Sequence, residues 1–387
     1  MALTSCRRSA CGVALAAASL AAPASAAAQA ETYIRMSFTA AQIYDGNLFA
    51  TPASLGPQAD HISRFGPALE AGYFSLPLEI AARYEIQAER YVTHTDLNEH
   101  VAHQDLTLSL RYRPTPRIAL QADASYIATQ TPGEFNIDSQ LGVGRAAAER
   151  VAASSTLTYK WSDVTDVTFE HMFGRDALVG GITSAMHRSR VGVQRETGLR
   201  NTYRADYHVR HVGFDAGTAV VSHVITAGWS HAITPRTGFE ITVGPRVTGG
   251  TIRPEMSTVL RRQLSRGDVS FGYSRTEVTA FGERGTIDVH RVAATGRYRP
   301  WRRLLLTATP AFTRSARAQR QVPVYTLDLE SVVAATHRLS VVAWGRLGRQ
   351  DGTLTGPPEL IPYQSVGLKF TITLPRSVPA IATRAAS

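Results

Sequence analysis

The chain consists of long runs of alternating apolar and polar residues, and a tight turn interrupts them roughly every 31 to 48 residues. The next run starts directly after each turn, and a second, more variable set of breaks falls about halfway between the tight turns. This rhythm is typical of an up-and-down antiparallel sheet. The tight turns fall near Leu76-Pro77, Pro114-Thr115-Pro116, Trp161-Ser162-Asp163, Gly198-Leu199-Arg200, Thr234-Pro235-Arg236, Arg266-Gly267-Asp268, Arg299-Pro300-Trp301 and His337-Arg338.

Each run has one apolar face and one charged face. In 76–92, one face carries Leu78, Ile80 and Tyr84, and the other carries Glu79 and Arg83. Successive side chains of a strand point to opposite sides of the sheet, so this period of two separates the faces. The runs, at about 12 to 16 residues, are longer than the five or six typical of soluble strands. A heavily charged inner face and an apolar outer face favour a membrane barrel.

Two absences in the sequence agree with a barrel. After the first thirty residues no apolar stretch of about eighteen residues remains that could span a bilayer as a helix. No run shows a clear helical period either. A closed barrel is the other way to satisfy the backbone within lipid. Aromatic residues recur at the strand ends, where they would form interfacial girdles: Tyr112, Tyr159, Trp161, Trp229, Tyr298, Trp301 and Tyr363.

The first thirty residues predict a secretory signal peptide. Arg7 and Arg8 give a positive start, 10–20 is a short apolar core, and small residues before Ala30 suit cleavage after it. Both cysteines of the chain lie in this segment, so the exported part would carry no disulfide. The predicted division is 1–30 signal peptide, 31–374 β-barrel and 375–387 disordered periplasmic tail.

The turn rhythm predicts an all-β transmembrane barrel of eighteen strands, with sixteen as the alternative because alternation blurs in 178–200 and 251–268. An even count places both termini in the periplasm of a Gram-negative bacterium. Eighteen strands enclose enough room for a water channel. The expected spans are 32–50, 60–75, 77–93, 99–113, 117–130, 147–161, 164–178, 183–198, 201–214, 217–233, 237–250, 255–265, 268–282, 286–299, 302–316, 320–337, 339–350 and 361–374.

The last expected strand resembles the C-terminal signal read by the machinery that inserts outer-membrane barrels. The segment 365–372 fits the pattern polar-x-Gly-x-x-apolar-x-apolar, with Gly367, Phe370 and Ile372 as its marked positions. The other interpretation is an ordinary amphipathic strand. The expected partners therefore include outer-membrane lipid and the barrel-insertion machinery.

Near the end of the first run, the segment 44–52 carries an aromatic-Asp-x-Asn-Leu-Phe motif made by Tyr44, Asp45, Asn47 and Phe49. It resembles the signature of a family of outer-membrane porins associated with exopolysaccharide clusters, although Gly46 stands where that family usually has a second Asp. The resemblance implies a port for secreted polysaccharide, working with a periplasmic polysaccharide-export protein.

Asp45 and Asn47 have two interpretations. They could form a polar cluster at the outer rim that holds a cation or a sugar hydroxyl. They could instead supply the bulged or left-handed backbone needed to end a long strand. The second interpretation is favoured.

Arginine dominates the basic charge, since the formal net charge is +10 and Lys160 and Lys369 are the only lysines. Arginines inside a pore would attract an anionic glycan or a small anion. They could equally brace the wall by pairing with acidic residues on neighbouring strands, and both roles are expected. No nucleic acid is expected as a partner. The arginines on expected lumen faces are Arg83, Arg111, Arg113, Arg204, Arg210, Arg246, Arg291, Arg297 and Arg346.

The sequence offers no catalytic motif. It lacks a Gly-x-Ser-x-Gly elbow and an HExxH helix, and its twelve histidines are scattered. The closest groupings are His94, His100 and His103, and His208, His211 and His223, which we interpret as ordinary loop or strand residues rather than metal ligands. No enzyme activity, cofactor or metal is predicted.

Function is predicted as a channel for hydrophilic, anionic material. Exopolysaccharide export is the leading hypothesis and rests mainly on the resemblance. A general diffusion porin for small solutes and a structural or adhesive barrel are the alternatives. The segment 131–146 is the longest expected outer connection. Its position separates the first two hypotheses, because an inward fold suits a small-solute porin and an open lumen suits a polymer exporter.

Overall fold

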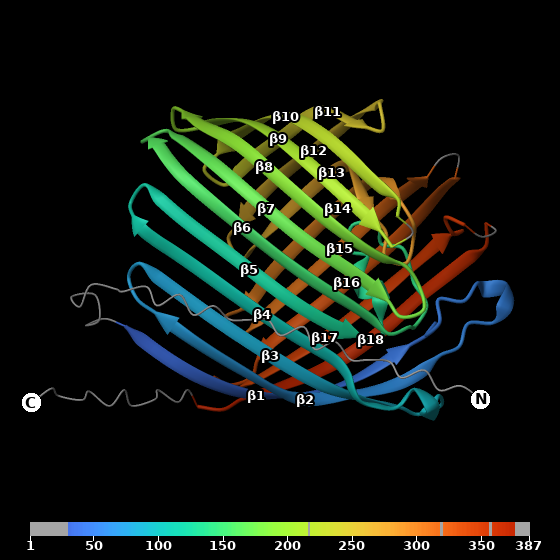
Figure 1. Ribbon diagram of the computed structural model, residues 1–387. Helices are drawn as coiled ribbons and strands as arrows, with labels where there is room; N and C mark the ends of the chain where they lie inside the picture. The colour runs from blue at the N-terminus through green and yellow to red at the C-terminus, as the bar shows by residue number, and fades with distance from the viewer. Residues whose placement is uncertain (1–29, 216, 318–319, 356–357, 376–387) are drawn as a thin grey trace, which may run out of the picture.

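The computed structural model describes residues 30–375, apart from 216, 318–319 and 356–357. Apart from Ala30 and Pro375, the predicted signal peptide 1–30 and the predicted tail 375–387 lie outside these residues. The described chain forms one antiparallel sheet of eighteen strands (Figure 1), in which each strand pairs with its neighbours in sequence. Strand β1 also pairs with β18, so the sheet closes on itself.

The strands are long and follow one another around the ring in sequence order. Their bounds are β1 Glu31–Asp45, β2 Asp60–Phe74, β3 Leu78–Tyr91, β4 Glu99–Thr115, β5 Ile118–Thr129, β6 Ala148–Ser162, β7 Thr165–Leu178, β8 Thr183–Thr197, β9 Asn201–Phe214, β10 Ala219–Thr234, β11 Thr237–Thr248, β12 Thr251–Leu264, β13 Gly267–Thr279, β14 Thr286–Trp301, β15 Leu304–Arg317, β16 Arg320–Ala334, β17 Leu339–Asp351 and β18 Leu360–Thr373. Three short 3-10 turns lie between strands: η2 Ala53–Leu55, η3 Thr95–Leu97 and η4 Pro132–Phe135.

The prediction of eighteen strands is confirmed, and sixteen is wrong. The largest boundary errors lie at two strand ends near the rim. The first strand was expected to reach residue 50 but ends at Asp45, because the side chain of Asn47 bonds to the backbone and turns the chain away from the sheet. Strand β12 starts at Thr251 rather than 255. Gly249 and Gly250 both have positive φ there and make a two-residue hairpin turn, so Thr251 pairs directly with Thr248.

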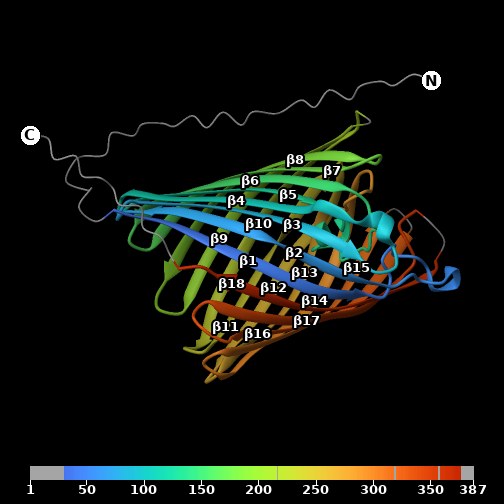
Figure 2. The same ribbon diagram turned by 90° about the horizontal axis from the view of Figure 1, so that it is seen from below.

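The two ends of the barrel differ. We call the end with the tight turns after β2, β4, β6, β8, β10, β12, β14 and β16 the turn end; β1 begins there and β18 finishes there. The opposite end, the loop end, carries the longer connections, including 46–59, 130–147 and 352–359. Figure 2 shows the same ring from below, with the strands running between these two ends.

Large apolar side chains cover the outside of the ring instead of filling a central core. Phe38, Leu69, Phe169, Phe271 and Phe370 are each about half exposed. Between them along the strands lie polar side chains that face the lumen, as the alternation predicts. Such an outer surface requires lipid to cover it. None of the helices described is both long and apolar enough to span a bilayer.

Candidate functional site

The connection between β5 and β6 crosses the lumen at the loop end. We call residues 130–147 the crossing loop; in Figure 1 this chain turns into the ring after β5. The Arg291 guanidinium on β14 donates to the carbonyl of Ile137 (2.8 Å), and the backbone N–H of Gly142 donates to the Gln350 side chain on β17 (3.0 Å). β14 lies nine places from β5 in the ring of eighteen strands, so the loop reaches the opposite wall.

Apolar contacts fix the crossing loop in place. Leu141 is buried with Val289, Val322, Val324 and Leu354, which line the inner wall of β14 and β16 and the β17–β18 connection. Water is excluded from this contact, and burying a Leu side chain contributes about 1.5–3 kcal/mol. The loop is therefore part of the folded structure at the mouth of the barrel.

A charged contact holds the end of the crossing loop, shortly before β6. Arg145 pairs with Glu89 of β3, and its guanidinium lies 4.5 Å from the centre of the Tyr91 ring. Burial lowers the pKa of Arg145 from its ordinary value, and the Glu89 carboxylate opposes that shift. The guanidinium is thus held charged by its partner at a buried position.

The β13–β14 hairpin is a second insert at the same end. The ladder between β12 and β13 runs from Leu264–Gly267 to Met256–Arg275 and stops there. Beyond this point the remaining β12 residues pair only with β11, and the remaining β13 residues pair only with β14. The wall therefore divides between β12 and β13 at the loop end.

The hairpin tip turns into the lumen rather than outward. Val278 and Ile287 pack against the cluster around Leu141 of the crossing loop. Phe281 packs with Phe135 of the loop and Ala148 of β6, and its backbone N–H donates to the Asn136 side chain (2.8 Å). The tip of the β13–β14 hairpin thus reaches across to β6, and the two inserts support each other.

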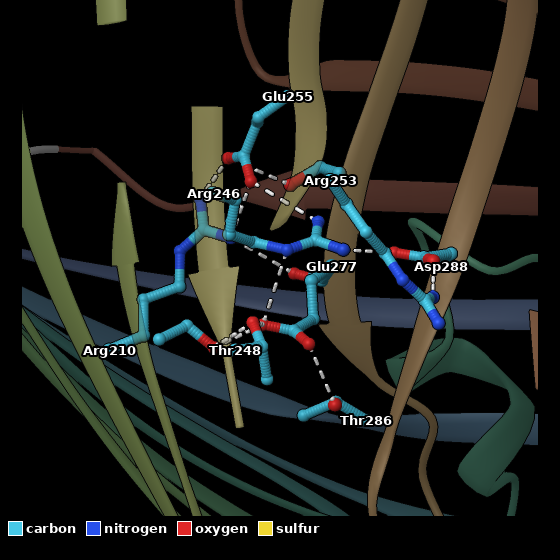
Figure 3. Close-up of polar contacts among 10 residues, drawn as sticks. Arg210, Arg246, Thr248, Arg253, Glu255, Glu277, Thr286 and Asp288 are labelled. Atoms are coloured by element: carbon cyan, nitrogen blue, oxygen red, sulfur yellow. Dashed lines mark hydrogen bonds and ion pairs between the residues drawn. The ribbon is translucent and has the colours of Figure 1, made fainter. Parts of the chain in front are cut away.

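Three arginines and three carboxylates fill the space where the ladder ends (Figure 3). We call them the arginine–carboxylate cluster: Arg210, Arg246, Arg253, Glu255, Glu277 and Asp288. Arg246 is at its centre, only 1% exposed, with Nη1 3.4 Å from Glu255, Nε 3.7 Å from Glu277 and Nη2 bonded to Asp288. Arg210 pairs with Glu255, and Arg253 pairs with Asp288.

The cluster also replaces missing sheet hydrogen bonds. The Arg210 guanidinium donates to the carbonyl of Glu277 (3.3 Å), at a position where β13 no longer pairs with β12. The Glu277 carboxylate accepts from Ser222 (2.5 Å) of β10 and from Thr286 (2.9 Å) of β14. Because buried charges are stable only when paired and hydrogen-bonded, these contacts fix the hairpin against the inner face of β9–β12.

The predicted lumen arginines fall into two groups. Arg83, Arg111, Arg204, Arg210, Arg246 and Arg346 have carboxylate partners, respectively Glu85, Glu79, Asp206, Glu255, Asp288 and Asp328. Arg291 bonds to the crossing loop, and Arg113 and Arg297 are exposed without an ion pair among the described residues. Of the six ion pairs, only Arg111–Glu79 and Arg346–Asp328 join neighbouring strands, and a role of the set in a substrate path stays a prediction.

The family-motif residues lie at the loop-end rim and make structural contacts. Asn47 is buried: its side chain donates to the carbonyls of Thr51 (2.8 Å) and Pro362 (2.9 Å) and accepts from the Thr51 N–H. Asp45 accepts from the Asn47 N–H (2.9 Å). Phe49 packs edge-on to His94 at 5.4 Å, and Tyr44 lies 5.1 Å from the His61 ring. These residues fold the β1–β2 connection back over the rim.

The residues of the predicted insertion signal all lie on β18. Phe370 and Ile372 are 43% and 51% exposed on the outer surface. Gly367 faces the opposite way, beneath the Trp344 indole of β17, which leaves no room for a Cβ. Packing against Trp344 therefore also explains a glycine at this position, independently of the predicted insertion signal.

The histidines do not form a metal site in the described part of the chain, where no three His, Cys, Asp or Glu side chains gather as metal ligands. His94 bonds instead to Asp60 (2.7 Å), and His100 to Arg90 (3.0 Å).

Sequence reasoning missed the central acidic residues of the cluster and the paired Arg145. One signal was available: Glu277 and Asp288 occupy positions that continue the apolar face of their runs, after Phe271 and before Val292. Charges at such positions indicate that a strand end has left the lipid surface. The alternation alone does not predict whether such a strand end turns into the lumen or away from the barrel.

Comparison with known proteins places the fold. No family model matches the chain, and no curated protein matches it in sequence. Among solved structures it is similar to OccAB4 of Acinetobacter baumannii, with 9% identity over 90% of this chain and 98% of that one and a TM-score of 0.51. It is also similar to OpdO of Pseudomonas aeruginosa, with 12% identity over 89% and 97% of the two chains and a TM-score of 0.50.

A bacterial polysaccharide outer-membrane secretin is also similar, but at a TM-score of 0.39. That similarity is too low to bear on the substrate. The closed ring of eighteen strands and its apolar outer surface match the fold of these solved outer-membrane porins: the chain is a closed antiparallel β-barrel with a porin-like fold.

Proposed function

We propose that this protein is a passive outer-membrane channel for small hydrophilic solutes, with a preference for anions. The observation that carries the proposal is the crossing loop, which reaches from β5 to β14, β15 and β17 and is anchored there by Arg291, Ser315 and Gln350. A loop that crosses the lumen limits the size of what can pass.

The position of this loop also bears on the choice between the two leading hypotheses. An extended polymer requires a continuous wide lumen, whereas small solutes can pass beside an inward loop. The structure has two inserts at the loop end, the crossing loop and the β13–β14 hairpin. The general diffusion porin is therefore favoured here, and exopolysaccharide export with a periplasmic partner stays a prediction that rests on the 44–52 motif.

The lumen wall supports polar passage. A groove of about 430 Å³ on the inner side of β2–β7 is lined by Glu70, Arg83, Thr107, Asp123 and Ser154, among others. Mixed charges and hydroxyls offer replacement hydrogen bonds to a hydrated solute without tight binding. Passage through such a wall needs no coupled energy source.

Single-channel recording in planar bilayers tests this function. The wild type should conduct in small steps. Replacing 133–144 by a short Gly-Ser linker should raise the conductance by about twofold or more, because an unobstructed ring of this size encloses an aqueous channel. A matched control replaces 53–57 of the β1–β2 connection with Gly-Ser and should leave the conductance unchanged.

Two outcomes would contradict the proposal. One is a folded wild type that conducts only after a periplasmic protein is added, which would favour a gated exporter. The other is a loop replacement that folds but conducts like the wild type, which would mean that the crossing loop does not limit passage.

A further inference from the structure

A wide groove lies at the turn end, away from the inserts. It has a volume of about 1520 Å³ and is built from three consecutive hairpin turns, those after β10, β12 and β14. Thr307 and Glu330, which are paired with each other on β15 and β16, also line it. They alternate with Leu306 and Leu329, both exposed on the outer surface, so the groove opens on the lumen side.

Arginine is concentrated in this groove. Seven arginines line it, against two carboxylates, Asp268 and Glu330, which is a surplus of five positive charges. Arg262 shares the outward face of β12 with the exposed Leu260 and Leu264, so it lies at the outer edge of the groove. All seven arginines are exposed, and within the described chain none of them has an ion pair. They are Arg236, Arg261, Arg262, Arg266, Arg297, Arg299 and Arg302.

Backbone contacts hold the three turns side by side. The N–H of Gln263 donates to the carbonyl of Arg236 (2.7 Å), and the N–H of Arg299 donates to the carbonyl of Arg266 (2.6 Å). The Arg266 guanidinium donates to the carbonyl of Pro300 (3.3 Å). Like charges are therefore kept close together on a rigid frame, a state that an anion would stabilise.

The arginines at the loop end differ from those of the groove. At the loop end the central arginines, Arg145 and Arg246, are buried and paired with carboxylates. At the turn end the guanidinium groups are exposed and, among the described residues, have no carboxylate partner. Their planar, forked donors suit carboxylate and phosphate oxygens, and several within one groove suit a ligand that carries several such groups.

We propose that this groove is a binding site for polyanionic solutes, those bearing several carboxylate or phosphate groups, at the lumen entrance of the turn end. The proposal rests on the proposed channel function and names the substrate class: anions are collected at this mouth before they enter the lumen.

Binding to purified, detergent-solubilised protein tests the site without any need for conduction, so a failure of the channel function leaves this test intact. The probe is fluorescently labelled oligogalacturonate, measured by fluorescence anisotropy, with a neutral dextran of matched length as the ligand control. We expect the wild type to bind the oligogalacturonate and not the dextran, and added salt to weaken binding through screening.

Two matched triple variants locate the site. Replacing Arg261, Arg297 and Arg299 with Gln should weaken binding by about tenfold, the sum of three exposed charged contacts. Replacing Arg117, Arg200 and Arg338, exposed arginines of other turns at the same end, with Gln removes the same charge and should change the affinity less than about twofold. A triple variant with Lys at 261, 297 and 299 should retain most of the affinity. That result would show that substitution at these three positions leaves the fold intact.

Three results would overturn the proposal. An equal loss of affinity in both Gln triple variants would show a general effect of charge and no binding site in the groove. Wild-type protein that fails to bind oligogalacturonate at low salt would rule out the ligand class. If the groove triple alters only the binding of phosphatidylglycerol vesicles, and not of the soluble anion, the arginines contact lipid headgroups and do not collect solutes.

Discussion

At the scale of single residues, Gly367 shows how one position can carry two interpretations. It sits in β18, paired with Trp344 on one side and Ile43 on the other, and the Trp344 indole covers it. An alanine there overlaps the indole, and overpacking of this kind costs about 1–3 kcal/mol. We predict that Gly367→Ala lowers the temperature at which the heat-modifiable folded band disappears on electrophoresis.

The control for this prediction is Gly296→Ala in β14, where a Cβ would meet no atom within 4 Å. It should leave the transition unchanged. Adding Trp344→Leu to Gly367→Ala should restore much of the lost stability. If the double variant stays as impaired as the single one, then contact with Trp344 is not the reason for the glycine, and a role in the insertion signal becomes the better explanation.

At the scale of elements, the arginine–carboxylate cluster decides where the β13–β14 hairpin lies. Replacing Arg246 with Gln leaves Glu277 and Asp288 with fewer partners at a buried position, and breaking a buried charge pair costs about 3–5 kcal/mol. We predict that the hairpin loosens: Phe281, which is 3% exposed in the folded protein, should become a site of chymotrypsin cleavage.

Arg346→Gln is the matched control for this cleavage assay. Arg346 also pairs with a carboxylate, Asp328, but their side chains are 47% and 35% exposed, and exposed pairs contribute less than about 1 kcal/mol. It should leave Phe281 protected. Protection of Phe281 in both variants would show that apolar packing of the tip against Phe135, and not the cluster, holds the hairpin.

The elements themselves were largely predictable, whereas the inserts were not. The turn rhythm and the strand alternation are local signals, so together they predicted eighteen strands and most of their bounds. The path of 130–147 depends on contacts between residues far apart in sequence, such as Asn136 with Phe281. No local pattern records such a contact, and the sequence therefore left the inward fold of this loop open. The cluster was partly visible, since Arg210 and Arg246 were on predicted lumen faces.

At the scale of the whole molecule, the fold depends on closure of the ring between the first and last strands. β18 pairs with β17 from Leu339–Ile372 to Asp351–Leu360, and with β1 from Ser37–Thr373 to Asp45–Ser365. Without β18, both β1 and β17 would present an open edge, and an open edge has no partner for its backbone within lipid. Stability should therefore be lost as a unit rather than strand by strand.

Two truncations test this dependence on closure. Ending the chain after Gln364 removes every residue of β18 that pairs with β1, whereas ending it after Pro375 keeps all of them. We predict that the shorter chain yields no heat-modifiable folded band in lipid vesicles and that the longer one folds like the wild type. In vitro refolding from urea needs no insertion machinery, so loss of a sorting signal cannot explain a failure there. A folded, protease-resistant product from the chain ending at Gln364 would show that the barrel can close without the β1–β18 ladder, and that this ladder is not the step on which the barrel depends.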